Sequence, residues 1–217
     1  MKTVGSPVND FRVVLQKRAA RYGVELTESP IEHLCDYYQL VREWNPRLHL
    51  VAPCSPAEFA TRHVLESLLL LPQLPANARV VDVGSGAGLP MIPVLTARPD
   101  LRAVLIESAA KKSVFLHEAL RVAAVAKQAN VITGRFENLA TPEADFVTCR
   151  ALDRFGELLP RLVQWAPRPG TLLLFGGAGL AKEIESTGLK YKAHHIPDSE
   201  RRLLFVIKPA SLAKREP

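Results

Sequence analysis

The segment that most constrains the fold of this 217-residue chain is Val80–Gly88, which reads VVDVGSGAG. Its β-branched residues predict a short buried strand. The glycines that follow predict a tight turn, because glycine adopts positive φ and lets the backbone come close to a ligand. In open parallel sheets, ligands bind beyond the carboxyl ends of the strands. The sequence therefore predicts a ligand site where this strand ends.

The spacing of the glycines narrows the kind of ligand. A dinucleotide fingerprint, GxGxxG, would need a third glycine where Leu89 stands. Instead Gly84, Gly86 and Gly88 form GxGxG, with Asp82 two residues ahead of them. This form is typical of S-adenosylmethionine-dependent methyltransferases, whose loop holds an amino-acid moiety and a nucleoside. Isolated GxGxG loops also occur by chance and in dehydrogenases, so the prediction depends on the rest of the chain.

From about residue 80 onward, short β-rich runs alternate with helical stretches. Strands are expected at residues 80–83, 103–106, 130–133, 146–149, 171–175, 189–196 and 203–207. Alternating strand–helix units predict a mostly parallel twisted sheet with helices on both faces. This is the Rossmann-like α/β architecture of class I S-adenosylmethionine-dependent methyltransferases, and we assign it to residues 76–217.

Residues 1–75 are expected to form a helical segment packed on that core. Two helix starts are predicted in it, at Ser29-Pro30 and at Ser55-Pro56. Each serine is followed by proline and, three residues after the serine, by glutamate. Apolar residues follow both starts at helical spacing. A looser turn is expected over residues 45–53.

Three further strand ends carry side chains suited to the same ligand. Glu107 follows the second strand, where its carboxylate can accept hydrogen bonds from ribose hydroxyls; capping of the next helix is the other role open to it. Phe136 and Glu137 follow the third strand, beside the expected adenine, although Phe136 could equally belong to the core. Arg150 follows the fourth strand, near the expected reactive methyl group, and a structural salt bridge is its alternative role.

The composition limits the remaining possibilities. The formal net charge is +6, which permits a polyanionic partner. The three cysteines lie far apart and show no metal-ligand spacing. We therefore expect no metal site, no disulfide and a reducing, cytoplasmic setting. No apolar stretch suits a targeting segment or a membrane span.

Several stretches together resemble the bacterial small-subunit (16S) ribosomal RNA guanosine-N7 methyltransferases, the RsmG or GidB family. The resemblance runs from about residue 38 to about residue 208. Its marks are Trp44-Asn45, Arg62-His63 with Glu66-Ser67, DVGSGAGLP at 82–90, Glu107-Ser108 with Lys111-Lys112, 134–137, and Cys149-Arg150-Ala151.

The resemblance implies roles for individual residues. Gly84 and Leu89 would line the cofactor site, and Phe136 with Glu137 would flank the adenine. Arg150 would reach the methionine end of the cofactor or the substrate. The substrate would be a guanosine in small-subunit ribosomal RNA, free or in a ribosomal particle, and a monomeric enzyme is favoured.

The sequence departs from the family pattern at two places that bear on function. Met91 stands where the family has a glycine, and Gly176 stands where it has a lysine. If that lysine contacts RNA in the family, its absence bears on the affinity for the substrate and on the identity of the substrate. Candidates for RNA binding are Arg62, Lys111, Lys112, Arg135, Arg154, Arg201 and Arg202, although each taken alone is more readily explained as an ordinary surface charge.

The leading hypothesis is methyl transfer from S-adenosylmethionine to N7 of a guanosine in small-subunit ribosomal RNA. Guanine N7 carries an in-plane lone pair, so orientation of the reactants is the main task and no catalytic base is predicted. Arg150 is the residue expected to position them. Two alternatives stay open: a small-molecule methyltransferase with the same cofactor core, and a non-catalytic RNA- or ribosome-binding protein on a methyltransferase scaffold.

Overall fold

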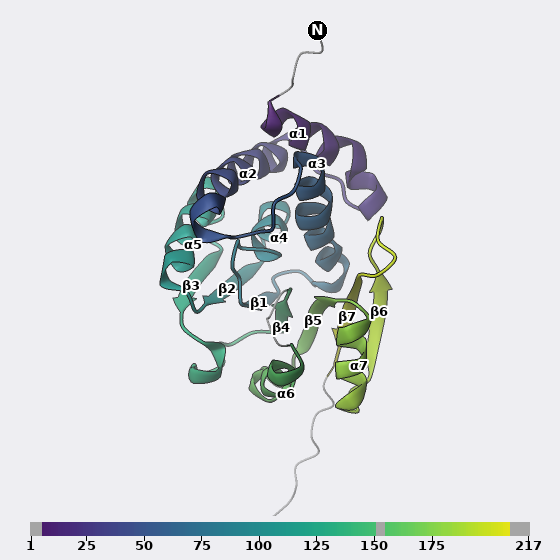
Figure 1. The fold of residues 1–217 in the computed structure, drawn as a ribbon. Coiled ribbons are helices and arrows are strands. Elements are labelled where there is room, and N and C mark those ends of the chain that lie inside the picture. The colour runs from purple at the N-terminus through teal and green to yellow at the C-terminus, as the bar shows by residue number, and fades with distance from the viewer. Residues whose placement is uncertain (1–5, 151–154, 209–217) are drawn as a thin grey trace, which may run out of the picture.

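The computed structural model describes residues 6–150 and 155–208 of the chain. One seven-stranded sheet organises them, with the strand order β3-β2-β1-β4-β5-β7-β6 (Figure 1). Its strands are β1 (Arg79–Val83), β2 (Arg102–Glu107), β3 (Ala129–Thr133), β4 (Phe146–Cys149), β5 (Thr171–Gly176), β6 (Tyr191–His195) and β7 (Leu203–Ile207). The first five strands pair in parallel, whereas β7 pairs antiparallel with β5 and β6. The order reverses between β1 and β4, and such a switch point opens a crevice at the carboxyl ends of the strands.

Helices cover both faces of this sheet. Side chains alternate along each strand, so Val80 faces one layer and Val81 the other. Val80 belongs to the apolar cluster that includes α4 (Met91–Ala97) and α5 (Ala110–Val122). Val81 belongs to the cluster that includes α6 (Phe155–Trp165) and α7 (Ala178–Ser186). The prediction of a mostly parallel sheet with helices on both faces is confirmed.

The N-terminal residues form helices that share one core with α4 and α5. They are α1 (Pro7–Arg18), η1 (Ala19–Tyr22), α2 (Glu28–Leu48), α3 (Pro56–Glu58), the π-helix η2 (Phe59–Leu65) and η3 (Leu68–Gln73). Figure 1 shows α1, α2 and α3 gathered at one end of the molecule, away from α6 and α7. Aromatic rings join them: the centroid of Tyr38 lies 4.5 Å from that of Phe11 and 4.9 Å from that of Phe59. The division of the chain at residue 75 stays a prediction.

Local sequence signals predicted some of these helix boundaries and missed others. At Ser55 the capping box is confirmed, because Ser55 Oγ accepts the Glu58 N–H at 3.2 Å and the Glu58 carboxylate accepts the Ser55 N–H at 2.9 Å. The predicted start at Ser29 is wrong, since α2 begins at Glu28 after an extended Thr27. Pro30 is tolerated in the first turn because the N–H groups there have no intrahelical partner.

The expected turn over residues 45–53 begins only at His49, which adopts a φ of 49°. The Asn45 side chain then holds the chain reversal, accepting the Val51 N–H at 3.0 Å and donating to the Val51 carbonyl at 3.1 Å. None of the helices among the described residues has the length and apolar character needed to cross a membrane.

Candidate functional site

A cavity of about 820 Å³ lies at the carboxyl ends of β1 to β4. Its volume is within the range of about 300–1,000 Å³ that is usual for small-molecule sites. We call one side of it the strand-loop wall, made of residues 83–87 and 89, 106–109 and 134–137. A second part of the lining, which we call the N-terminal wall, consists of residues 50–52 and His63, with Arg150 in contact with His63. Lys112 and residues of α6 complete the lining.

The glycines of the strand-loop wall have two different tasks. Gly84 and Gly86 line the cavity with φ values of 72° and 52°. A Cβ added at Gly86 would meet only the Gly84 carbonyl oxygen, at 3.8 Å, so this residue leaves space for a ligand. A Cβ at Gly88 would instead lie 2.3 Å from Ile92 Cδ1. Gly88 therefore lets the loop pack closely against α4.

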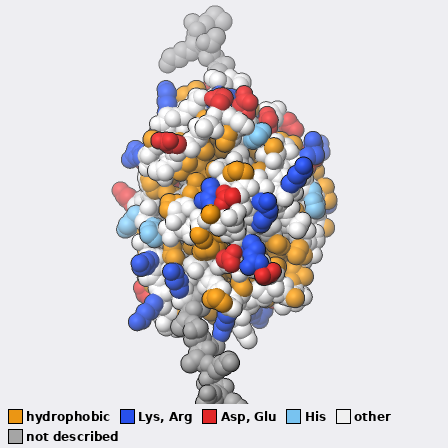
Figure 2. Space-filling view, turned by 180° about the vertical axis from the view of Figure 1, so that it is seen from behind, with side chains coloured by type: hydrophobic (Ala, Val, Ile, Leu, Met, Phe, Trp, Pro, Cys, Tyr) orange, Lys and Arg blue, Asp and Glu red, His pale blue; other side chains and the backbone are white. Residues whose placement is uncertain are grey.

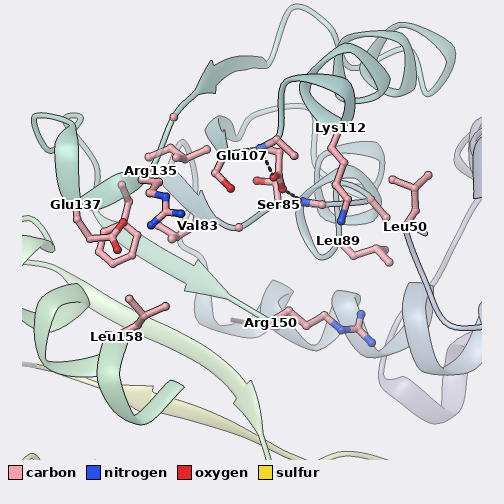
Figure 3. Close-up of a pocket in the computed structure, with 18 of the residues that line it drawn as sticks. Leu50, Val83, Ser85, Leu89, Glu107, Lys112, Arg135, Glu137, Arg150 and Leu158 are labelled. Carbon is pink, nitrogen blue, oxygen red and sulfur yellow. Dashed lines mark hydrogen bonds between the residues drawn. The ribbon is translucent and has the colours of Figure 1, made fainter. Parts of the chain in front are cut away.

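Glu107 fastens the loops after β1 and β2 to each other. Its Oε2 accepts the Gly86 N–H at 2.9 Å, and its Oε1 accepts the Ala109 N–H at 2.8 Å (Figure 3). Ala109 is the N-cap residue of α5, so the carboxylate supports this helix start as well as the cavity. Each oxygen keeps a second lone pair for a ligand. The two roles predicted for Glu107 are thus compatible.

Asp82 lies behind the loop and does not line the cavity. It is 1% exposed, and neither carboxylate oxygen has a hydrogen-bond partner among the described residues. Burial raises the pKa of Asp82 from 3.8 to about 7, and the nearby Glu107 charge acts in the same direction. A buried carboxylate without a partner is costly.

Tyr37 joins the N-terminal helices to the glycine loop. This residue of α2 is fully buried, and its hydroxyl donates to the carbonyl of Ala87 at 2.8 Å. The loop that shapes the strand-loop wall is therefore held from outside the sheet as well as by Glu107.

Arg150 reaches from the end of β4 into the N-terminal helices (Figure 3). Its Nη1 donates to the carbonyl of His63 at 3.0 Å and to Ser67 Oγ at 3.1 Å. Its Nη2 donates to the carbonyl of Arg62 and lies 3.4 Å from Glu66 Oε2. The salt bridge considered for Arg150 is present, and the residue lines the cavity too.

Glu66 is the carboxylate of this cluster, with a side chain that is 2% exposed. Arg202 adds a second cation, because its Nη1 lies 2.6 Å from Glu66 Oε1. Burial raises the pKa of Glu66, while Arg150 and Arg202 oppose that rise. The charge of Arg150 therefore sits in a buried ionic cluster.

His63 lies in η2 and lines the cavity. Its Nδ1 is 3.4 Å from Arg150 Nη2, and its ring centroid is 5.1 Å from that of Phe59. Burial, and then the charges of nearby arginines, lower the pKa of His63 to about 3. The imidazole is therefore neutral at physiological pH.

The structure brings most of the predicted cofactor residues together. Phe136 is both core and lining, since it is 4% exposed and packs edge-on against Trp165 at 5.5 Å. Of the predicted set, the cavity is lined by Gly84, Gly86, Leu89, Glu107, Phe136, Glu137 and Arg150. Their contacts with a cofactor stay predictions.

The predicted RNA-binding residues are more scattered. Lys112 and Arg135 line the cavity, whereas Arg202 is engaged by Glu66. Arg62, Lys111 and Arg201 are exposed outside the lining, and Arg154 lies outside the described residues. The sequence analysis assigned no site role to several other residues that line the cavity: Leu50, Val51, Ala52, Ser85, Ser108, Leu158 and Arg161.

Comparison with known proteins identifies the family to which the chain belongs. Residues 30–204 match the family model GidB, described as rRNA small subunit methyltransferase G. The ribosomal RNA small subunit methyltransferase G of Sorangium cellulosum is 37% identical over an alignment of 177 positions that covers 77% of this chain and 73% of that protein. The protein of the same name from Xanthomonas axonopodis pv. citri is 41% identical over 152 residues, or 70% and 71% of the two chains.

Solved structures share the fold at lower sequence identity. An RNA methyltransferase from Salinibacter ruber, in complex with S-adenosyl-L-homocysteine, has a TM-score of 0.54 and 17% identity, over 76% of this chain and 97% of that one. The mitomycin 7-O-methyltransferase MmcR has a TM-score of 0.59 and 17% identity, over 94% and 69%. Proteins with this fold thus act on different substrates.

Proposed function

Because the chain belongs to the rRNA small subunit methyltransferase G family, and so is an S-adenosylmethionine-dependent methyltransferase of ribosomal RNA, we propose that it methylates N7 of a guanosine in small-subunit ribosomal RNA. The observation that carries the proposal is the make-up of the cavity. Its strand-loop wall suits the cofactor, and its N-terminal wall offers positioning groups where the base would enter.

The strand-loop wall fits S-adenosylmethionine in shape and in chemistry. The space beside Gly86 is open to a ligand, and the Glu107 carboxylate has lone pairs left for hydroxyl donors. Asp82 lies behind the loop without a hydrogen-bond partner among the described residues, and its contact with the cofactor stays a prediction. When bound, the cofactor supplies an electrophilic methyl group on a sulfonium. Gly84, Leu89, Phe136 and Glu137 complete the proposed cofactor site.

The N-terminal wall supports N7 as the acceptor atom. Guanine N7 needs no deprotonation, so the protein has to orient the base rather than remove a proton. His63, with a pKa lowered to about 3, is a weak base, and Arg150 can only donate hydrogen bonds and cannot take up a proton. The pairing of Arg150 with Glu66 also offsets a positive charge close to a base that becomes cationic on methylation.

Basic residues around the cavity support binding of RNA phosphates. Lys112, Arg135 and Arg161 contribute to its lining, and Arg62 is exposed beside His63. On the face in Figure 2, lysines and arginines are interspersed with acidic and apolar side chains. We place the RNA at the cavity mouth, with the target base turned out of its stack.

Three broader expectations accompany this function. Residues 1–75 act as a helical segment that completes the cavity of the 76–217 core, through contacts such as those of Tyr37 and His63. The protein acts as a monomer on free RNA or a ribosomal particle. It does so in the cytoplasm.

The test is methyl transfer from labelled S-adenosylmethionine to purified small-subunit RNA and to small subunits that lack the modification. Borohydride reduction followed by aniline cleavage would map N7-methylguanosine to a nucleotide. We expect one guanosine to be labelled. Label on another atom, or transfer to small molecules only, would overturn the proposal.

A further inference from the structure

The imidazole of His63, in the N-terminal wall, has a hydrogen-bond partner in Arg150 but no function assigned to it above. His63 comes from η2, whose π-helical turn is marked by the Glu66 N–H bonding to the Thr61 carbonyl five residues earlier. Single π-turns of this kind occur often at functional sites. Here the turn sets His63 against the cavity, while Phe59 and Val64 on either side of it are fully buried.

Arg150 fixes the tautomer of His63. A guanidinium can only donate hydrogen bonds, so the Nδ1 atom that lies 3.4 Å from Arg150 Nη2 must be the acceptor. In a neutral imidazole the proton is then on Nε2. Arg150 also donates to the carbonyl of His63 at 3.0 Å, which holds the backbone. A neutral His63 in this tautomer has Nε2–H as its ring donor, and the residue lines the cavity.

We propose that His63 recognises the target base by donating its Nε2–H to O6 of guanine, with Arg150 as the positioning residue behind it. This inference rests on the proposed function. Guanine offers an acceptor at O6, whereas adenine carries an amino donor at the same place. A fixed donor therefore selects guanine and leaves N7, next to O6 on the same edge, directed at the methyl group.

A neutral donor suits this place better than a charged one. Methylation of N7 leaves a positive charge on the base, and an imidazolium would repel it. The positive charges near the imidazole are Arg150, Arg62 and Arg202, and Glu58 opposes them. These groups and burial keep the proton off Nδ1, so His63 donates without adding charge.

The test is a double-mutant cycle in which the O6 atom of the target base and the imidazole of His63 are removed separately and together. The target guanosine is replaced by 2-aminopurine riboside, which lacks O6 and keeps N7, and His63 is replaced by alanine. We expect each change alone to reduce the single-turnover rate by about tenfold or more, the cost of leaving a buried partner unpaired. Together they should cost little more than either alone, because both remove the same hydrogen bond.

Two further measurements separate base recognition from a structural effect. His63→Gln, which restores an N–H donor, should recover part of the preference for guanosine over 2-aminopurine, both in rate and in RNA affinity. Cofactor affinity by titration calorimetry should stay unchanged in His63→Ala. The matched control is His117→Ala, on an exposed position of α5 away from the cavity, which should behave as wild type.

If the rate reduction with both changes equals the product of the two single reductions, the proposed role of His63 is wrong. Loss of cofactor binding in His63→Ala would also overturn it. So would a glutamine variant that binds cofactor and shows no preference between the two bases. A wild-type protein that methylates no guanosine N7 would instead overturn the proposed function, since that result does not involve His63.

Discussion

The two walls of the cavity are held together in different ways. In the strand-loop wall, backbone N–H groups of neighbouring loops meet the Glu107 carboxylate, and glycines with positive φ set the shape. In the N-terminal wall, Arg150 binds residues 83 to 88 positions earlier in the chain and forms a buried ionic cluster with Glu66. Substitutions in the first wall should therefore affect cofactor affinity more than stability, whereas substitution of Arg150 in the second wall should lower stability together with the methyl-transfer rate.

The largest expected effect on the strand-loop wall is that of Gly86→Arg. The side chain would fill the space beside the loop, and the φ of 52° would add strain of about 1–2 kcal/mol. We expect titration calorimetry to detect no binding of S-adenosylmethionine, and circular dichroism to show that the fold is kept. Gly179→Arg is the control, since Gly179 is exposed and a Cβ there would meet nothing within 4 Å. Undiminished cofactor binding in Gly86→Arg would remove the proposed cofactor site.

The corresponding substitution in the N-terminal wall is Arg150→Lys. Lysine keeps the charge but cannot place donors on His63, Ser67 and Arg62 at once. We expect the free energy of unfolding to fall by about 3–5 kcal/mol, together with the methyl-transfer rate. Urea denaturation measures the loss of stability, with Arg121→Lys at an exposed position of α5 as the control. A variant as stable as wild type would show that this cluster does not hold the wall.

The same difference explains what the sequence could predict. The strand-loop wall comes from a local pattern, which is a strand, spaced glycines and an acid at the next strand end. This pattern predicts Gly84, Gly86 and Glu107 as ligand-site residues, and all three line the cavity. The N-terminal wall arises only when η2 packs beside the end of β4. Nothing near Arg150 in sequence indicates that its partner would be Glu66, and His63 carried no signal beyond its place beside Arg62 in the family pattern.

A third prediction concerns the carboxylate behind the loop. Burial raises the pKa of Asp82 from 3.8 to about 7, so the folded state holds this proton more tightly than the unfolded chain does. The resulting stability is present below about pH 4 and is lost as the pH rises to about 7. Asp82→Asn should remove this loss and be more stable than wild type at pH 8 by about 2–4 kcal/mol. Glu66 has the same direction of shift and stays in both proteins, so a slope unchanged by Asp82→Asn would assign the pH dependence elsewhere.

The smallest expected effect is that of Glu107→Gln, which best separates ligand binding by the strand-loop wall from structural support. Glutamine keeps one acceptor oxygen, so it can satisfy the N–H of either Gly86 or Ala109 while its own amide N–H faces the other. We expect the affinity for S-adenosylmethionine to fall by about 1–3 kcal/mol. Calorimetry on the folded variant gives this value, and urea denaturation gives its stability.

The ratio of the two losses decides which role of Glu107 dominates. If the carboxylate only tethers the β1 loop to the start of α5, the unfolding free energy falls and the folded molecules bind the cofactor with near-normal affinity. If it also accepts hydrogen bonds from the ligand, affinity falls by more than stability does. Glu118→Gln changes a half-buried carboxylate of α5 that is paired with Arg121, and it supplies the baseline for removing a charge on this helix. An affinity loss that occurs in Glu107→Gln and not in Glu118→Gln would show that the strand-loop wall serves mainly to bind the ligand. The N-terminal wall, in which Arg150 forms the buried ionic cluster, would then differ in serving mainly to stabilise the fold.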